Sequence, residues 1–190
     1  MTGDGAGGGA GTIGPMDVLA FWRAAGADRW FEQDPAFDAE IAARFFELWR
    51  AAAEGKLAQW EATPEGALAL VIVLDQFPRN MFRGGARMYE TDAAARAVAG
   101  HALARGFDRQ VAQVERRFYY LPFMHSEDCA DQDRCVKLAR GYGDEEFTRY
   151  AEHHAGIVRR FGRFPHRNAA LLRATSAEEQ AFLDDGGFAG

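Results

Sequence analysis

Two short segments of the chain repeat one order of residue types, and each carries an arginine suited to bind an anion. They are Gln76-Phe77-Pro78-Arg79-Asn80 and Arg163-Phe164-Pro165-His166-Arg167-Asn168. A guanidinium offers a planar pair of donors that fits a carboxylate or a phosphate. A proline there is expected to end a helix and free its last carbonyls, which an asparagine side chain can bond. Arg79, Asn80, Arg167 and Asn168 are therefore candidate ligand-binding residues.

A third segment places a histidine where it could act as a base. His125 follows the apolar, aromatic residues 119–124 and directly precedes Ser126 and Glu127. Ser126 is expected to cap a helix, and a helix N-terminus lowers the pKa of a nearby histidine. A neutral imidazole oriented by Glu127 would suit general base catalysis, with His166 as a second proton donor. In the structural alternative, Glu127 and Asp128 only interact favourably with the positive end of the helix dipole, and His125 packs against aromatic rings.

Asp75 and His154 complete the candidate ligand-binding set. Asp75 lies four residues before Arg79 and could pair with it. His154 falls on the apolar face of an expected helix, where a histidine is more often a hydrogen-bonded core residue than a ligand. The structural alternative applies to the whole set: the arginines would pin helix ends, and the repeated segments would be corners of the fold.

The spacing of ligand-type residues indicates neither a metal nor a cofactor. The histidines and the glutamate named above would reach a shared metal only from separate helices. Cys129 and Cys135, six residues apart, form neither a CxxC redox pair nor a pair of zinc ligands. Gly3, Gly5 and Gly8 match the dinucleotide-binding string GxGxxG, but no strand precedes them, so the match is accidental.

The composition is that of a globular protein without nucleic-acid or membrane partners. Of 190 residues, 48% are hydrophobic and 26% charged, and the net charge of −6 disfavours binding to nucleic acid or to an acidic membrane surface. No apolar run reaches the ~18 residues of a membrane span, and the N-terminus does not resemble a signal peptide. We therefore expect a cytoplasmic protein. The sequence leaves its oligomeric state open.

Helical periodicity extends through nearly the whole chain. Residues 1–14 are rich in glycine and predict a disordered tail, and residues 15–190 predict a single all-helical domain of about seven to nine helices. We expect Pro78 and Pro122 to end the helices before them. Start and stop signals place the helices near residues 17–25, 35–49, 64–77, 92–105, 110–120, 126–140, 144–161 and 176–184.

Three longer segments resemble the family called domain of unknown function 924 (DUF924), which is grouped with tetratricopeptide-like helical folds. They are residues 74–80, 120–128 and 160–168, and the resemblance covers about residues 16–185. It implies an α-α superhelix of paired helices and no established activity. At Leu171-Leu172-Arg173 the chain carries leucine where the family is expected to have a small residue, which leaves the local turn open.

Three functions fit these residues. The first is an enzyme, a hydrolase or lyase acting on an anionic small molecule held by Arg79 and Arg167. The second is a scaffold that binds a peptide or protein along a helical array. In the third, the segments are structural corners only. We favour the first, because corners alone would not require His125, Glu127 and His166.

Overall fold

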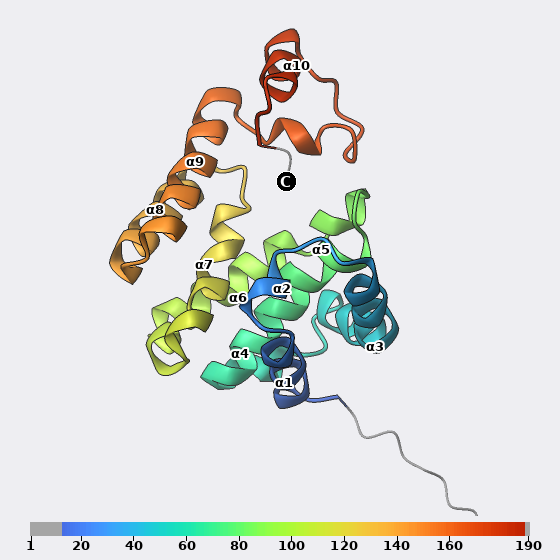
Figure 1. Cartoon of the computed structure of the whole chain (residues 1–190). Helices are drawn as coiled ribbons and strands as arrows, with labels where there is room; N and C mark the ends of the chain where they lie inside the picture. Colours follow the sequence, from blue (N-terminus) through green and yellow to red (C-terminus); the bar gives the residue numbers. More distant parts are fainter. Residues whose placement is uncertain (1–12, 189–190) are drawn as a thin grey trace, which may run out of the picture.

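The computed structural model describes residues 13–188, and every regular element within that range is helical (Figure 1). The all-helical prediction is thereby confirmed. The expected tail lies outside the described residues except for its last two positions, so its separation from a domain at residues 15–190 stays a prediction. The α-helices are α1 Pro15–Ala25, α2 Ala27–Trp30, α3 Pro35–Ala53, α4 Pro64–Val71, α5 Phe77–Met81, α6 Asp92–Ala104, α7 Arg117–Met124, α8 Cys129–Tyr142, α9 Glu145–Phe161 and α10 Ala177–Asp184.

Most helices begin where local capping signals place them. The Asp34 carboxylate accepts hydrogen bonds from the first turn of α3, and the Thr63 hydroxyl accepts one from Gly66 at the start of α4. Ser176 and Glu179 form a capping box at the start of α10, which begins near the expected residue. The prediction for α8 is wrong, because Asp128 and not Ser126 caps that helix. The Ser126 hydroxyl instead donates to the side chain of Asp131.

The core forms around α4, whose residues from Gly66 to Val71 are buried on all sides. Helices α1, α6 and α7 pack against it, and α8 and α9 lie side by side at the edge of the molecule (Figure 1). A second, smaller apolar cluster of Ile157, Val158 and Phe164 lies in the C-terminal part of the chain. Among residues 13–188 no helix is both long and apolar enough for a bilayer crossing.

Pro78 does not end the helix that precedes it, contrary to the prediction. The chain continues from α4 through a π-helical segment, Ile72–Gln76, into α5. A wider turn accommodates a proline, whose ring would clash with the carbonyl four residues back in an α-helix. The freed groups find other partners: the Leu74 carbonyl accepts from the Thr91 hydroxyl at 2.5 Å, and the Asp75 carbonyl accepts from the Arg79 guanidinium.

Pro122 also lies inside a helix, α7, rather than at its end. Two 3-10 turns, Phe107–Gln110 and Gln113–Glu115, precede α7, whereas we expected one helix over about residues 110–120. All residues of α7 from Phe118 to Met124 are buried, so apolar burial outweighs the one backbone hydrogen bond that a proline removes. The buried amide of Gln132 donates to carbonyls just past Pro122, including those of Met124 and Ser126.

The two repeated segments therefore have different structures. The first passes through a continuous helix. The second follows the end of α9, after Gly162 in the left-handed conformation, and forms the 3-10 turn Pro165–Arg167. Consecutive helices from α6 to α9 pack each against the next. The tetratricopeptide-like superhelix stays a prediction.

Candidate functional site

Asp75, Arg79 and His125 form the centre of the candidate site. Nδ1 of His125, at the end of α7, lies 2.9 Å from Oδ1 of Asp75, which is fully buried in the π-helical segment. A guanidinium nitrogen of Arg79 lies 3.4 Å from the same carboxylate oxygen. Burial raises the pKa of Asp75, but the charge of Arg79 and the hydrogen bond from His125 outweigh it and lower that pKa overall. Asp75 is therefore a carboxylate, and Nδ1 of His125 is the donor.

Asp92, the first residue of α6, links the arginines of the two repeated segments. Its Oδ1 accepts a hydrogen bond from Nη2 of Arg79 at 3.0 Å, and its Oδ2 lies 3.7 Å from Nη1 of Arg167. Arg79 thus has two carboxylate partners and a backbone carbonyl. The structure brings together the arginines that the sequence singled out.

Arg167 is held mainly by aromatic rings. Its guanidinium carbon lies 4.5 Å from the ring centre of Tyr89 and 4.6 Å from that of Phe164. The side chain is 7% exposed, and its Nε has no hydrogen-bond partner among the described residues. Burial and the nearby charge of Arg79 lower the pKa of Arg167. Arg167 is therefore the arginine with donor capacity to spare.

Two further histidines belong to this region and are kept neutral. Nδ1 of His154 donates to the Tyr150 carbonyl at 2.8 Å, and burial lowers the pKa of His154 to about 4. Burial and then Arg167 lower the pKa of His166 to about 4 as well, and its buried Nδ1 has no partner among the described residues. Burial also lowers the pKa of His125, with a further contribution from Arg79. All three imidazoles are neutral near pH 7.

Glu127 does not orient His125, contrary to the prediction. Its carboxylate accepts hydrogen bonds from Arg173 at 2.7 and 3.0 Å and from the Phe164 backbone nitrogen at 2.8 Å. Local sequence order suggested the wrong partner, because the chain bends after α7 and Asp75 approaches His125 from another helix. Glu127 fastens the second repeated segment to the start of α8.

The two asparagines do not bond the released carbonyls beside the prolines. Asn80 donates to Asp38 of α3 at 2.8 Å, and Asp38 also pairs with Arg83. Asn168 accepts from Arg173 at 3.0 Å and donates to Thr175 at 3.3 Å. Both side chains are buried and fix neighbouring segments, so the structure assigns them contacts with the fold.

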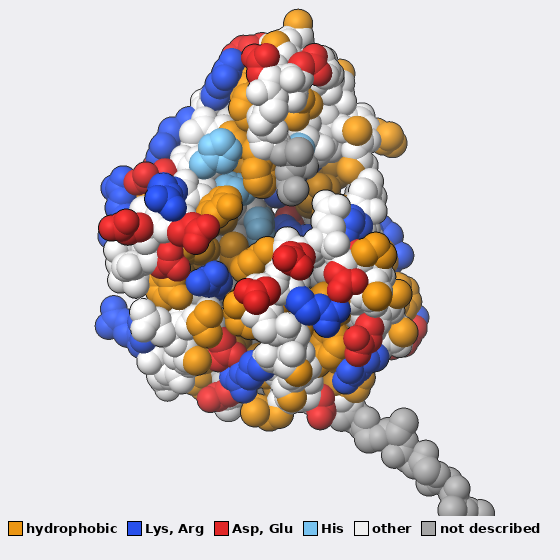
Figure 2. Space-filling view, viewed as in Figure 1, with side chains coloured by type: hydrophobic (Ala, Val, Ile, Leu, Met, Phe, Trp, Pro, Cys, Tyr) orange, Lys and Arg blue, Asp and Glu red, His pale blue; other side chains and the backbone are white. Residues whose placement is uncertain are grey.

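Sequence reasoning missed three contributors to this site. Asp92 looked like an ordinary first-turn acid of its helix, Tyr89 lay in a segment without periodicity, and Phe188 lies near the end of the chain. The preceding Thr91 makes no capping bond, and its hydroxyl donates instead to the Leu74 carbonyl of the first repeated segment's helix, a contact that the sequence does not reveal. Figure 2 shows a hollow between the part that carries α10 and the part that carries α5, with histidine side chains along its wall.

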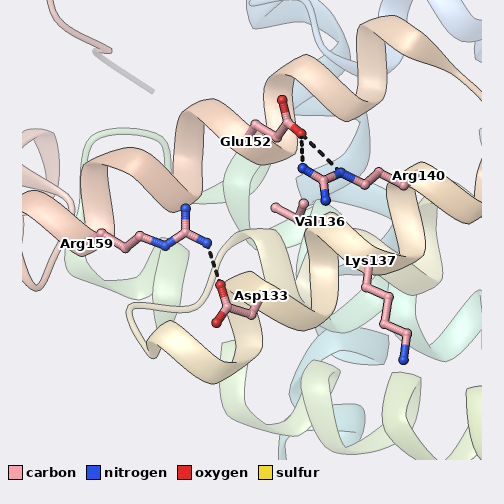
Figure 3. Close-up of a pocket in the computed structure, with 6 residues that line it drawn as sticks. All are labelled: Asp133, Val136, Lys137, Arg140, Glu152 and Arg159. Carbon is pink, nitrogen blue, oxygen red and sulfur yellow. Dashed lines mark hydrogen bonds and ion pairs between the residues drawn. The ribbon is translucent and has the colours of Figure 1, made fainter.

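A separate surface groove lies between α8 and α9 and contains none of the candidate residues. Two ion pairs cross it, Arg140 with Glu152 at 2.6 Å and Arg159 with Asp133 at 2.5 Å (Figure 3). Each of these four charges is matched by a partner, whereas Lys137, which also lines the groove, makes no ion pair with the described residues. Across the described part of the chain, no three His, Cys, Asp or Glu side chains are placed to hold a metal ion together.

The proteins that this chain is similar to share its fold, and their descriptions name no activity. Residues 18–187 match the model of a family described as bacterial protein of unknown function (DUF924). A solved structure of a protein of unknown function from Agrobacterium tumefaciens is 48% identical, with a TM-score of 0.88 over 90% of this chain and 97% of that one. The search of curated proteins returned no match.

Proposed function

This chain belongs to the DUF924 family of bacterial proteins, and we propose that its site binds a small anionic molecule and acts on it by acid–base chemistry, as a hydrolase or a lyase. The observation that carries the proposal is the hydrogen bond between the fully buried Asp75 and His125, made beside Arg79. Arg79 shares Asp92 with Arg167, whose Nε has no partner among the described residues. Buried ionisable groups with shifted pKa values, gathered from separate helices, are typical of active sites.

His125 is the proposed general base. Because the Asp75 carboxylate accepts the Nδ1 proton, Nε2 carries the lone pair in the neutral ring. The lowered pKa of His125 keeps the ring neutral near pH 7, ready to accept a proton. If Nε2 of His125 takes the proton from a water molecule that attacks the ligand, the reaction is a hydrolysis. If Nε2 takes the proton from a carbon atom next to the ligand's carboxylate, the reaction is that of a lyase.

Arg167 is the proposed anion-binding residue, whereas Arg79 acts on other protein groups. The donors of Arg79 are used by Asp75 and Asp92, so its charge orients the carboxylate behind His125. Arg167 faces one carboxylate oxygen at 3.7 Å, which is beyond hydrogen-bonding distance. An incoming carboxylate or phosphate would therefore gain donors that the fold leaves unused.

His166 has a narrower role than the one expected from the sequence. With a pKa of about 4 it holds no extra proton near pH 7, so it would donate a hydrogen bond from a neutral ring. Glu127 and Arg173 would act indirectly, because both hydrogen-bond to the backbone of Phe164. These bonds position the turn that carries His166 and Arg167.

The test separates binding from chemistry. Purified protein is titrated with small carboxylates and phosphates by isothermal calorimetry, and a panel of anionic esters and hydroxy acids is screened for turnover. Arg167→Met is expected to weaken binding at least tenfold, and His125→Asn to abolish turnover while binding persists. Arg159→Met, in the groove between α8 and α9, is the matched control. Anion binding that is equally strong in wild type and Arg167→Met would contradict the proposal.

A further inference from the structure

Phe188, which follows α10, packs onto the histidines of the proposed site. Its ring centre lies 4.5 Å from that of His154 and 5.1 Å from that of His166, both in edge-to-face geometry. His153 lies 5.9 Å away. Phe188 also packs against the small cluster that contains Phe164, so an aromatic ring from the chain itself lies beside the anion-binding turn.

The turn before Phe188 is built to bring the chain back onto these rings. Gly186 has a φ of +79°, and the Gly187 nitrogen donates to the Phe182 carbonyl at 2.9 Å, which closes α10 with a Schellman-type turn. A Cβ on Gly187 would lie 2.4 Å from that carbonyl oxygen and 2.6 Å from the Phe182 ring. Only glycine fits there, so the return of the chain is specified by the sequence.

We infer that Phe188 occupies an apolar subsite of the anion site, and that the ligand is a monocarboxylate bearing an aromatic ring that takes the place of Phe188. The inference rests on the proposed function, since the carboxylate is to be bound by Arg167. The ring would be received by His154, His166 and Phe164, which already surround one aromatic side chain.

The charges around Arg167 favour one negative charge on the ligand. Three arginines, Arg79, Arg167 and Arg173, face three acids, Asp75, Asp92 and Glu127. The neutral histidines add no charge near pH 7. A phosphate monoester would bring close to two negative charges beside Asp92 and Glu127, whereas a carboxylate brings one.

The geometry of Arg167 also favours a planar acceptor. Tyr89 and Phe164 take its cation–π contacts, which leaves the in-plane N–H groups for a ligand. A carboxylate meets a guanidinium in that plane with two parallel hydrogen bonds. The neutral imidazoles and the Phe164 ring form walls that accept an aromatic edge or face without an unpaired charge.

The experiment compares wild type with Phe188→Ala, using 3-phenylpropanoate, propanoate and phenyl phosphate as probes in calorimetric titrations. Removing Phe188 frees the subsite, so 3-phenylpropanoate should bind about ten- to a hundredfold tighter to the variant, the range expected for burying one ring. Propanoate should bind both proteins equally, and phenyl phosphate more weakly than 3-phenylpropanoate. Phe31→Ala is the control, because that phenylalanine is 55% exposed and stacks on Phe118 instead.

A second measurement uses the unaltered protein. Saturating 3-phenylpropanoate should abolish the nuclear Overhauser contacts between the rings of Phe188 and His154. If these contacts persist at saturation, or if the affinity of Phe188→Ala for 3-phenylpropanoate equals that of wild type, the subsite assignment is overturned. If phenyl phosphate binds as tightly as 3-phenylpropanoate, the inference that the ligand is a monocarboxylate is overturned.

The outcomes separate this inference from the proposed function. If Arg167→Met weakens propanoate binding but Phe188→Ala does not raise the affinity for 3-phenylpropanoate, the anion site is supported and the aromatic subsite is refuted. If Phe188→Ala binds 3-phenylpropanoate more tightly and adding Arg167→Met does not change that affinity, the aromatic subsite is supported and the anion site is refuted.

Discussion

The side chains of Asp75 and His125 are joined by a 2.9 Å hydrogen bond although 50 positions separate them in the chain. One comes from a π-helical segment and the other from the end of α7. Because Asp75 is fully buried and ionised, the bond fixes which nitrogen of His125 carries the proton. This pair is the part of the site most open to direct measurement.

The first prediction concerns the tautomer of His125. Two-bond ¹H–¹⁵N spectra of the wild type near pH 7 should show a neutral ring protonated at Nδ1. Asp75→Asn should lower the pKa of His125 further, because the Asp75 charge and hydrogen bond raise that pKa. The variant should also lose about 3 kcal/mol of stability, since Arg79 loses a buried partner. Asp133→Asn, at a surface ion pair, is the control, and an Nε2-protonated ring in the wild type would refute the assignment.

The second prediction distinguishes the two arginines. Arg79→Met should cost about 3–5 kcal/mol in urea unfolding, because it leaves Asp75 and Asp92 without their buried partner. Arg167→Met should cost less, about 1–2 kcal/mol, since Arg167 has one long ion pair and cation–π contacts that methionine partly replaces. Equal losses of unfolding free energy in the two variants would mean that Arg167 stabilises the fold as much as Arg79 does, contrary to the prediction.

The third prediction is that acid weakens the fold between about pH 6.5 and pH 4. His154 and His166 have pKa values of about 4 in the folded protein, against 6.5 for the free side chain. Within that window the unfolded chain binds more protons, so the free energy of unfolding falls as the pH falls and is steady above it. Each histidine can contribute a few kcal/mol over the window. Urea titrations at pH 7 and pH 5 measure the change.

The matched variants for that measurement are His154→Gln and His101→Gln. The first should flatten the pH dependence, because it removes one of the two buried imidazoles. The second replaces a largely exposed histidine that contacts Glu61, and it serves as the control for losing a histidine at the surface. A pH dependence that is the same in all three proteins would contradict the attribution to His154.

The fourth prediction concerns the turn that the sequence left open at Leu171-Leu172-Arg173. Leu172 has a φ of 53° and is 94% exposed, so it holds a left-handed backbone conformation that leucine disfavours and buries almost nothing in return. Leu172→Asn should stabilise the protein by about 0.5–1 kcal/mol, because asparagine tolerates that conformation. Thermal unfolding measures the gain, with Leu171→Asn as control. A lower melting temperature for Leu172→Asn would show that Leu172 has a contact worth more than the strain.

Signals that act within a few residues were predicted well. Three helices begin near the residues where the start signals placed them, capped by Asp34, Thr63 and Ser176, because a capping bond depends only on the next three residues. The two proline predictions were wrong for the opposite reason. Pro78 continues a helix because Thr91, from a distant turn, takes a carbonyl that the proline would otherwise leave unpaired.

Sequence reasoning named several residues that the structure links, but not the contacts that link them, and their role as a functional site stays a proposal. Arg79, Arg167 and His125 do come together, as the density of ionisable residues in the repeated segments suggested. The partner of His125 was assigned to Glu127, its neighbour in sequence, because a single sequence does not reveal which carboxylate another helix supplies. Asp92 and Phe188 were missed since each carries an ordinary local explanation, as a first-turn acid and as a residue near the chain end.

The small C-terminal apolar cluster has a consequence for hydrogen exchange. It contains only Ile157, Val158 and Phe164 with three partly buried phenylalanines, whereas the main core includes the buried apolar residues of α9 up to Ala155. Asp92 and Glu127 add polar contacts between this cluster and the main body. So little apolar burial makes it the part of the chain that opens first. Amides of α10 should then exchange with solvent deuterium far faster than those of α4. The wall of the hollow can thus separate while the rest of the protein stays folded, which provides a way in for a ligand.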